Sequence, residues 1–280
     1  MKVIRAHYAG ACYGVQRALN LALKQAEQPC KTFTLGPLIH NPQVVSQLAE
    51  QGVSQIDSVD DLTHDDAVVI RSHGVTPQVM RAVSQTSATV VDATCPHVSR
   101  AQKAAAQLAE QLGCVIVVGE KGHPEVEGLV ACAREKCSRV YALTSVEELP
   151  DNLPKHLGIV VQTTQQKAIL DAIVAHLQKR NITVEVKNTI CDATSQRQDT
   201  AAELAQHVDG MVIIGGRNSS NTTRLADICR QYCKHVFHIE HVSELFSCNF
   251  HDIHVMGVSA GASTPEDQIE AVVSYLEQLS

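Results

Sequence analysis

The sequence has 280 residues, of which 44% are hydrophobic and only 3% are aromatic, and it contains no tryptophan. This length supports a real hydrophobic core and more than one small domain, built mainly from Val, Ile, Leu and Ala. The net charge of −7 excludes the basic surface typical of nucleic-acid binding proteins, so we expect no nucleic-acid partner.

The N-terminus and the apolar runs indicate neither a secretory signal nor a membrane span. The chain begins MKVIRAHYAG, which lacks the apolar core of a signal peptide. Apolar runs such as residues 114–118 are far too short to cross a bilayer. We therefore expect a soluble cytoplasmic protein with no membrane partner, in which the ten cysteines do not form a disulfide framework.

The first predicted unit is anchored on Cys12, which follows a strand-like start and precedes a helical segment. The next β-branched run ends at Gly36, 24 residues after Cys12, and His40 follows 28 residues after Cys12. A further apolar strand then runs into His73. Both histidines therefore fall directly after predicted strands.

The second unit repeats this order around Cys95. A strand after the helical segment ends at Gly119, again 24 residues after the cysteine. His123 and Glu125 follow 28 and 30 residues after Cys95. A second strand in the same unit leads into Thr163. The equal spacing indicates an internal repeat with polar residues at the strand ends.

The third unit is anchored on Cys191 and completes the repeat. Its strand ends at Gly215, once more 24 residues after the cysteine, with Ser219 and Asn221 at positions +28 and +30. The last predicted strand runs into Ser263. Polar side chains thus follow two strands in each of the three units.

This alternation of strands and helices predicts an α/β fold made of βαβ units, each with a small, mainly parallel sheet and flanking helices. We expect three lobes, residues 1–95, 96–190 and 191–280, related by a pseudo-threefold axis around a central cluster. No Gly/Ser linker separates them, so we expect the lobes to pack together. The N-terminal strand, within residues 1–11, is expected to pair with the third lobe.

Ligands of open parallel sheets bind at the carboxyl ends of the strands, so three related lobes would bring Cys12, Cys95 and Cys191 to one point. Structural zinc prefers four ligands, usually in close pairs such as C-x-x-C, which this chain lacks. Three thiolates suit one 4Fe–4S cluster that keeps an open iron, able to act as a Lewis acid and to pass electrons. The other seven cysteines are interpreted as packing or incidental thiols.

Several short motifs occur in a defined order along the chain: residues 10–18, 39–41, 72–75, 92–96, 122–128, 162–164, 190–191, 218–221 and 259–263. In this order they resemble the 4-hydroxy-3-methylbut-2-enyl diphosphate reductases, the LytB-type iron–sulfur enzymes, over nearly the full length. The resemblance implies a reductive dehydroxylation of (E)-4-hydroxy-3-methylbut-2-enyl diphosphate to isopentenyl and dimethylallyl diphosphate. It also implies the last step of the non-mevalonate isoprenoid pathway.

The implied substrate is an anion, and a net-acidic protein must bind it with local donors. The predicted substrate-binding residues are His40, His73, His123, Thr163, Ser219, Ser220, Asn221 and Ser263. Ser219 and Asn221 have an alternative role as helix caps. The two roles are compatible, because a capped helix N-terminus is itself an anion site.

The resemblance makes Glu125 the proton source, with Thr163 and His123 supporting it. We expect the pKa of this carboxyl to be raised beside a cluster and a diphosphate, because like charge disfavours ionisation. The alternative is a carboxylate that only stabilises a helix N-terminus, a role that suits Glu127 better. The chain has no G-x-G-x-x-G loop, so we predict no bound flavin or nicotinamide, and reduced ferredoxin or flavodoxin as electron donor.

Two other classes remain open from the residues alone. One is a three-cysteine 4Fe–4S dehydratase of the quinolinate-synthase type, which needs no external electrons. The other is a non-catalytic iron–sulfur sensor, which needs no diphosphate site. Dependence on a reductant and binding of diphosphate distinguish these alternatives from the reductase.

Overall fold

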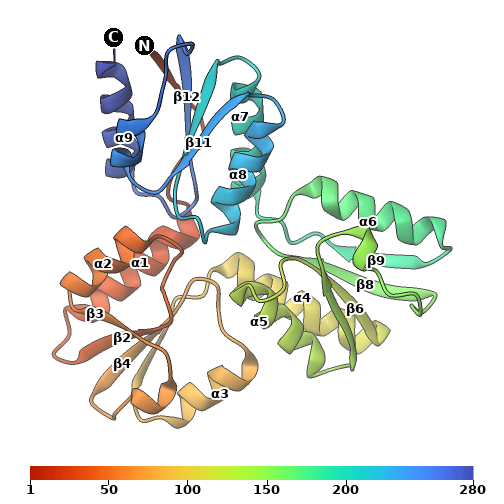
Figure 1. The fold of residues 1–280 in the computed structure, drawn as a ribbon. Coiled ribbons are helices and arrows are strands. Elements are labelled where there is room, and N and C mark those ends of the chain that lie inside the picture. Colours follow the sequence, from red (N-terminus) through yellow and green to blue (C-terminus); the bar gives the residue numbers. More distant parts are fainter. Residues whose placement is uncertain (280) are drawn as a thin grey trace. The chain divides into compact units, whose positions relative to one another are not determined.

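The computed structural model describes residues 1–279, which form three four-stranded parallel sheets with flanking helices (Figure 1). The first sheet consists of β2 (Lys31–Leu35), β3 (Val53–Ile56), β4 (Asp66–Ile70) and β5 (Thr89–Asp92). The second consists of β6 (Cys114–Val118), β7 (Arg139–Leu143), β8 (His156–Val161) and β9 (Thr183–Lys187). The third consists of β10 (Gly210–Ile214), β11 (His235–Ile239), β12 (Val255–Ala260) and β1 (Lys2–Arg5).

The three sheets share one topology. Their strand orders are β3-β2-β4-β5, β7-β6-β8-β9 and β11-β10-β12-β1. In the third sheet the last place is taken by the N-terminal strand, with Lys2 opposite Val255 and Arg5 opposite Val258. In each sheet the strand order therefore changes direction between the two central strands. Ligands of open α/β sheets bind at this topological switch point.

Nine α-helices connect these strands within residues 1–279. They are α1 (Tyr13–Ala26), α2 (Pro42–Glu50), α3 (Pro77–Gln85), α4 (Pro96–Leu112), α5 (Pro124–Arg134), α6 (Lys167–Lys179), α7 (Asp192–Ala205), α8 (Ser220–Arg230) and α9 (Glu266–Gln278). Short 3₁₀ helices occupy Val59–Asp61, Val146–Glu148 and Val242–Ser247. None of the helices within the described residues combines the length and the hydropathy that a membrane span requires.

Thr-Pro pairs precede two of these helices, as the sequence indicates. Thr76 caps α3 by accepting a hydrogen bond from the Val79 amide, and Pro77 is the first helical residue. Before α9 the register differs by one position, because Pro265 itself occupies the N-cap and the helix begins at Glu266.

The central strands other than β2 are largely buried on both faces, which explains their mainly apolar sequences. In β6, Val115 and Val117 pack in a core with α4 and α5, whereas Ile116 and Val118 pack in a core with α6. Helices therefore cover both sides of this sheet (Figure 1). Strands β4 and β10 are likewise buried throughout.

One strand of each sheet was not predicted from the sequence: β3, β7 and β11. Each is an edge strand that is only partly buried, so its sequence lacks the continuous apolar run of a central strand. The β-propensity of the residues identifies such edge strands poorly, because their formation depends on pairing with the neighbouring strand.

The chain divides into two compact units. The first, here called the β10–β12 unit, contains Met1–Gln16, Ile39–Ser46 and the chain from Asp192 onward, and the second, the β2–β9 unit, contains Arg17–Leu38 and Gln47–Cys191. The β2–β9 unit thus holds two of the sheets, and α1 and α2 both cross the boundary between the units. Three lobes of residues 1–95, 96–190 and 191–280 stay a proposal for the domain organisation.

Candidate active site

The three predicted cluster cysteines occupy the same position in the repeat. The fourth strand of each sheet, β1, β5 or β9, leads into one cysteine, and a helix begins directly after it. The amide of each cysteine donates a hydrogen bond to the carbonyl two residues beyond the third strand. The pairs are Cys12 to Ala262 at 3.0 Å, Cys95 to Ser72 at 2.9 Å and Cys191 to Thr163 at 2.9 Å. The local backbone is therefore equivalent at all three.

These side chains fit an iron–sulfur cluster by their chemistry. All three are half-buried, and each lies at the N-terminus of a helix, where partial positive charge favours a thiolate ligand. Other cysteines differ: burial raises the pKa of Cys229 to about 12 and that of Cys132 to about 11. Those two remain neutral thiols at pH 7, which agrees with the packing role predicted for them.

Two arginines hold the loops that carry cysteines, and the sequence patterns gave them no role. Arg17, on α1, donates to the carbonyls of Thr94 and Asp92 at 3.2 and 3.3 Å, directly before Cys95. Arg197, on α7 and only 6% exposed, donates through Nη2 at 2.6 Å to the carbonyl of Gly10, two residues before Cys12. The sequence did contain a signal for this role: the two arginines follow Cys12 and Cys191 by similar distances, five and six residues.

Glu125 and Thr163 form a buried pair within the β2–β9 unit. The Glu125 carboxyl lies in the first turn of α5 and is 1% exposed. Its Oε1 accepts a hydrogen bond from the Thr163 amide at 2.6 Å, and its Oε2 accepts from Thr163 Oγ1 at 2.9 Å. Thr163 follows β8, so the ends of two neighbouring strands bring this pair together.

His123 and His73 lie in the same unit. His123 is the N-cap of α5, and its Nδ1 accepts a hydrogen bond from the Glu125 amide at 3.1 Å. A neutral ring with Nδ1 as acceptor carries its proton on Nε2, which is then a donor. The His73 ring meets the His123 ring edge-on, with centroids 5.5 Å apart. The predicted residues Glu125, Thr163, His123 and His73 are therefore gathered at one edge of this unit.

In the β10–β12 unit, polar residues open α8. Ser219 is the N-cap, and its Oγ accepts from the Thr222 amide at 3.4 Å, so its helix-capping role is observed directly. Ser220 and Asn221 follow in the first turn and are buried. Asn221 is 4% exposed, and neither its Nδ2 nor its Oδ1 has a hydrogen-bond partner among residues 1–279. Both amide atoms can therefore bond to a group other than these residues.

His40 and Ser263 meet in the same unit. Ser263 Oγ donates to the His40 carbonyl at 3.2 Å, and Asn41 Nδ2 donates to the Ser263 carbonyl at 2.9 Å. A Cβ at Gly216, in the loop after β10, would lie 2.6 Å from the His40 carbonyl oxygen. The backbone around His40 therefore packs tightly against the loops that follow β10 and β12. Asn41 was noted only as part of a motif, and its structural role is this contact.

Known proteins resemble the chain over its full length. Residues 3–277 match a family model described as LytB protein. A 4-hydroxy-3-methylbut-2-enyl diphosphate reductase of Trichlorobacter lovleyi is 45% identical, with 100% of this chain and 99% of that protein covered. The reductase of the same name from Syntrophotalea carbinolica is 44% identical, with 100% of both chains covered.

Two solved structures agree with the fold. One, of (E)-4-hydroxy-3-methyl-but-2-enyl diphosphate reductase, the terminal enzyme of the non-mevalonate pathway, has 39% identity, a TM-score of 0.73 and full coverage of both chains. The other, a Plasmodium falciparum reductase, has 23% identity and a TM-score of 0.92, covers 99% of this chain and 88% of that one, and bears on the fold alone. The predicted α/β class, with three parallel sheets and flanking helices, is confirmed.

Proposed function

The chain belongs to the LytB protein family, and we propose that it reduces (E)-4-hydroxy-3-methylbut-2-enyl diphosphate. The reaction consumes two electrons and two protons, breaks the allylic C–O bond, and yields water with isopentenyl or dimethylallyl diphosphate. It is the terminal step of the non-mevalonate pathway, as for the similar solved enzyme. The family confirms the resemblance read from the motifs and supports neither the dehydratase nor the sensor alternative.

The observation that carries this proposal is the buried amide of Asn221. A buried polar group without a partner costs about 1–3 kcal/mol, so its persistence indicates a ligand that satisfies it. The amide lies in the first turn of α8, where exposed backbone N–H groups favour an anion. A diphosphate supplies the acceptor oxygens that Asn221 Nδ2 and this helix terminus lack.

We assign the remaining predicted residues to the same substrate. Ser219, Ser220 and Ser263 add hydroxyl donors in the β10–β12 unit, with His40 beside Ser263. In the β2–β9 unit, His73 and His123 supply imidazole donors, His123 through Nε2 of its neutral ring. Neutral and titratable donors together compensate for the net negative charge of the chain.

Cys12, Cys95 and Cys191 are the proposed ligands of one 4Fe–4S cluster. Support comes from their equivalent backbone positions and from the helix N-terminus at each. When bound, such a cluster supplies electrons one at a time and, at the iron without a cysteine ligand, a Lewis-acid position. With no flavin or nicotinamide loop in the sequence, a reduced ferredoxin or flavodoxin is the proposed donor, in the cytoplasm.

Glu125 is the proposed proton source. The 2.9 Å contact between its Oε2 and Thr163 Oγ1 offers a path for proton transfer toward substrate. His123 fixes the backbone of Glu125 through its Nδ1, which leaves Nε2 as a donor. Glu125 is thus the proposed acid, Thr163 the proposed relay, and His123 the residue that orients the acid.

Anaerobic turnover of the allylic diphosphate, with dithionite and a viologen as reductant, tests the proposal. We expect the wild type to release both products. We expect Glu125→Gln to lower kcat by about 10²-fold or more, the range for loss of a general acid, with iron content unchanged. Glu135→Gln, at the exposed end of the same helix, is the matched control.

Two outcomes separate the parts of this proposal. A wild type that holds its full iron content yet leaves the substrate unreduced would exclude the reductase activity. A Glu125→Gln variant as active as the wild type would exclude only the proton-donor role.

A further inference from the structure

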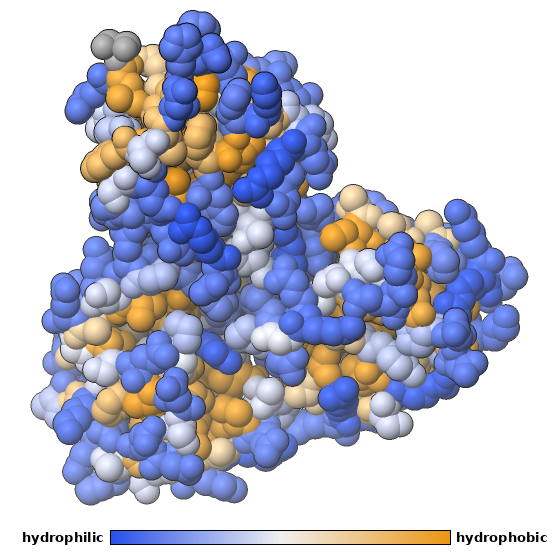
Figure 2. All heavy atoms as spheres, in the orientation of Figure 1, coloured by the Kyte–Doolittle hydropathy of each residue, from blue (hydrophilic) through white to orange (hydrophobic). Residues whose placement is uncertain are grey.

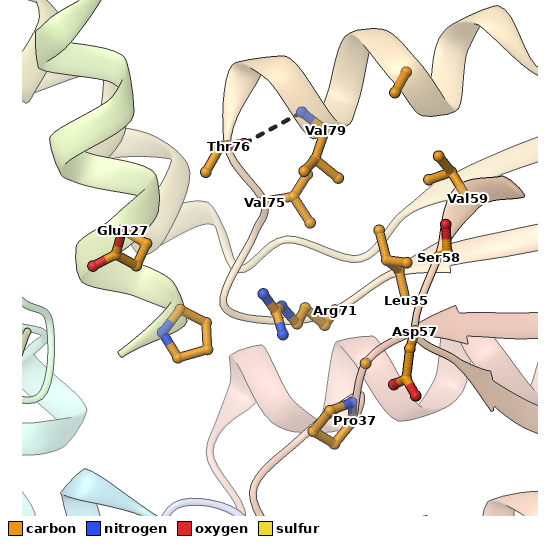
Figure 3. A pocket seen from close by; sticks show the side chains of 13 residues that line it. Leu35, Pro37, Asp57, Ser58, Val59, Arg71, Val75, Thr76, Val79 and Glu127 are labelled. Carbon is orange, nitrogen blue, oxygen red and sulfur yellow. Dashed lines mark hydrogen bonds between the residues drawn. The ribbon is translucent and has the colours of Figure 1, made fainter. Parts of the chain in front are cut away.

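A pocket of about 520 Å³ lies at the carboxyl ends of β2, β3 and β4, within the β2–β9 unit (Figure 3). Its size lies in the range of small-molecule sites. Most of its wall is apolar, with Leu35, Val59, Val75, Val79 and Ala82 among the lining residues. None of the residues proposed for the cluster or for the diphosphate lines it.

One cation projects into this pocket. Arg71 follows β4 directly and is half-buried, and Figure 3 shows its guanidinium between the walls. Its Nε donates to the Gly74 carbonyl at 3.3 Å, and within residues 1–279 it forms no ion pair with an acidic side chain. Desolvation by burial lowers the pKa of Arg71 from its ordinary value. A partly desolvated guanidinium with open Nη donors favours an anionic ligand.

The internal repeat shows that this cation is particular to the first sheet. The residue that directly follows the third strand is Arg71 in the first sheet, Gln162 in the second and Gly261 in the third. Gln162 closes over Gly119, and its Oε1 accepts from the Glu120 amide at 3.0 Å, so this position is filled by protein there. The first sheet instead presents a charge at the same place.

Gly36 makes room for that charge. It has φ +69°, a left-handed conformation that favours glycine, and a Cβ there would lie 2.9 Å from Arg71 Nη1. The left-handed backbone at Gly36 favours glycine, and the absence of a side chain there leaves room for the guanidinium beside it.

Charge and polarity define the class of ligand. Two exposed carboxylates, Asp57 and Glu127, also line the pocket, on opposite sides of Arg71 in the view of Figure 3. They oppose a polyanion such as a diphosphate, whereas one carboxylate is matched by one guanidinium. Figure 2 shows apolar residues at the surface among hydrophilic ones over the sheet of β2, β3 and β4, as elsewhere on this face. We propose that this pocket binds a small monocarboxylate with an apolar body, held by Arg71.

The bound carboxylate would contact two segments that carry proposed active-site residues, the loop after β4 and the first turn of α5. Arg71 and Val75 flank His73, and Pro124 and Glu127 flank Glu125. These two segments thus form part of the pocket wall, but they present different side chains to it. The site is independent of the proposed reaction, and its test requires no turnover.

Isothermal titration of the anaerobically purified protein with octanoate tests the proposal. We expect a dissociation constant on the order of 1 mM, as suits a ligand of about ten heavy atoms. Arg71→Gln should weaken octanoate at least about tenfold. Ala82→Leu, which fills the pocket and leaves the charge in place, should weaken it similarly. Arg81→Gln, on the exposed face of α3 and paired with Glu135, should leave binding unchanged.

Neutral octanamide is the matched probe, and it should bind at least about tenfold more weakly than octanoate. Absence of octanoate binding up to about 10 mM would overturn the proposal. Equal binding by a folded Arg71→Gln variant, checked by circular dichroism, would do the same. Binding of octanamide as tight as that of octanoate would show that the ligand class is wrong.

Discussion

Asn221 and Glu125 are both almost fully buried, yet their polar atoms are satisfied differently. Glu125 accepts two hydrogen bonds from Thr163, which orient its carboxyl. Asn221 has no partner for either amide atom among residues 1–279. A satisfied buried group has a held orientation, whereas an unsatisfied one requires a partner such as water, an ion or a ligand. The two side chains therefore suit proton transfer and substrate binding, respectively.

We predict that Asn221→Ala raises KM for the allylic diphosphate by about tenfold or more, because it removes one buried donor to the anion. Stability in urea should stay equal or rise slightly, since the substitution removes an unsatisfied amide from the interior. Asn152→Ala, at an exposed loop position, is the control. An unchanged KM would show that the buried amide does not meet the substrate.

Glu148 provides a pH-dependent contribution to stability. The Lys121 ammonium and, next, the Thr144 hydroxyl lower the pKa of its carboxyl to about 2, from an ordinary value of 4.5. A lowered pKa means that the ionised carboxylate stabilises the folded state fully above about pH 4.5, and that this contribution is lost as pH falls toward about 2.

Urea unfolding of the wild type and Glu148→Gln, between pH 6 and pH 3, measures this effect. The wild type should be more stable at pH 6 by less than about 1 kcal/mol, since the pair is solvent-exposed and screened. The difference should shrink as the pH is lowered. A difference that grows on acidification would contradict the assignment.

At the scale of elements, the repeated unit is a strand, a cysteine and a helix. The fourth strand of each sheet leads into a cysteine, whose amide is fixed by a carbonyl beyond the third strand. Arg17 and Arg197 add a second restraint, since each reaches from the helix after one cysteine to the loop before another. Each arginine thereby links a helix to a loop that is distant from it in the sequence.

We predict that Arg197→Ala loses at least half of the bound iron, because the Gly10 carbonyl and the loop before Cys12 lose a buried donor. Arg197→Lys should retain more iron than the alanine variant, since it keeps one charged donor. Arg230→Ala, which removes an exposed arginine paired with Asp227, should behave as the wild type. Full iron content and an unchanged electron paramagnetic resonance spectrum in Arg197→Ala would rule out this positioning role.

At the scale of the molecule, one topology occurs three times, and each copy contributes one cysteine. The three copies differ in the side chains that come after their central strands: His40 and His73, then Glu125 and Thr163, then Asn221 and Ser263. The repeat thus supplies an equivalent framework, and the side chains that we propose for binding and proton transfer differ from copy to copy.

Because the three cysteines occupy equivalent positions, we predict that replacing any one of them causes a similar loss of iron and sulfide. Cys12→Ser, Cys95→Ser and Cys191→Ser should each abolish most of the iron and sulfide content, because each removes one of three proposed thiolate ligands. Cys30→Ser is the control, since this thiol lies outside the repeat position. Retention of the full iron and sulfide content by any one of the three variants would remove that cysteine from the ligand set.

Local patterns in the sequence determined much of the framework. Buried central strands such as β6 and β10 carry continuous β-branched runs, and Thr-Pro pairs mark helix starts, because both signals depend on neighbouring residues. The equal spacing of glycines and polar residues after Cys12, Cys95 and Cys191 exposed the repeat. The order of the motifs was sufficient to identify the family.

Contacts between distant residues were decided only by the tertiary structure. Thr163 meets Glu125 across 38 positions, and Arg197 meets Gly10 across 187. The edge strands β3, β7 and β11, the burial of Asn221 and the pocket at Arg71 likewise depend on which surfaces pack together. Local propensity and periodicity describe one segment at a time, whereas burial and hydrogen-bond partners are properties of the assembled chain.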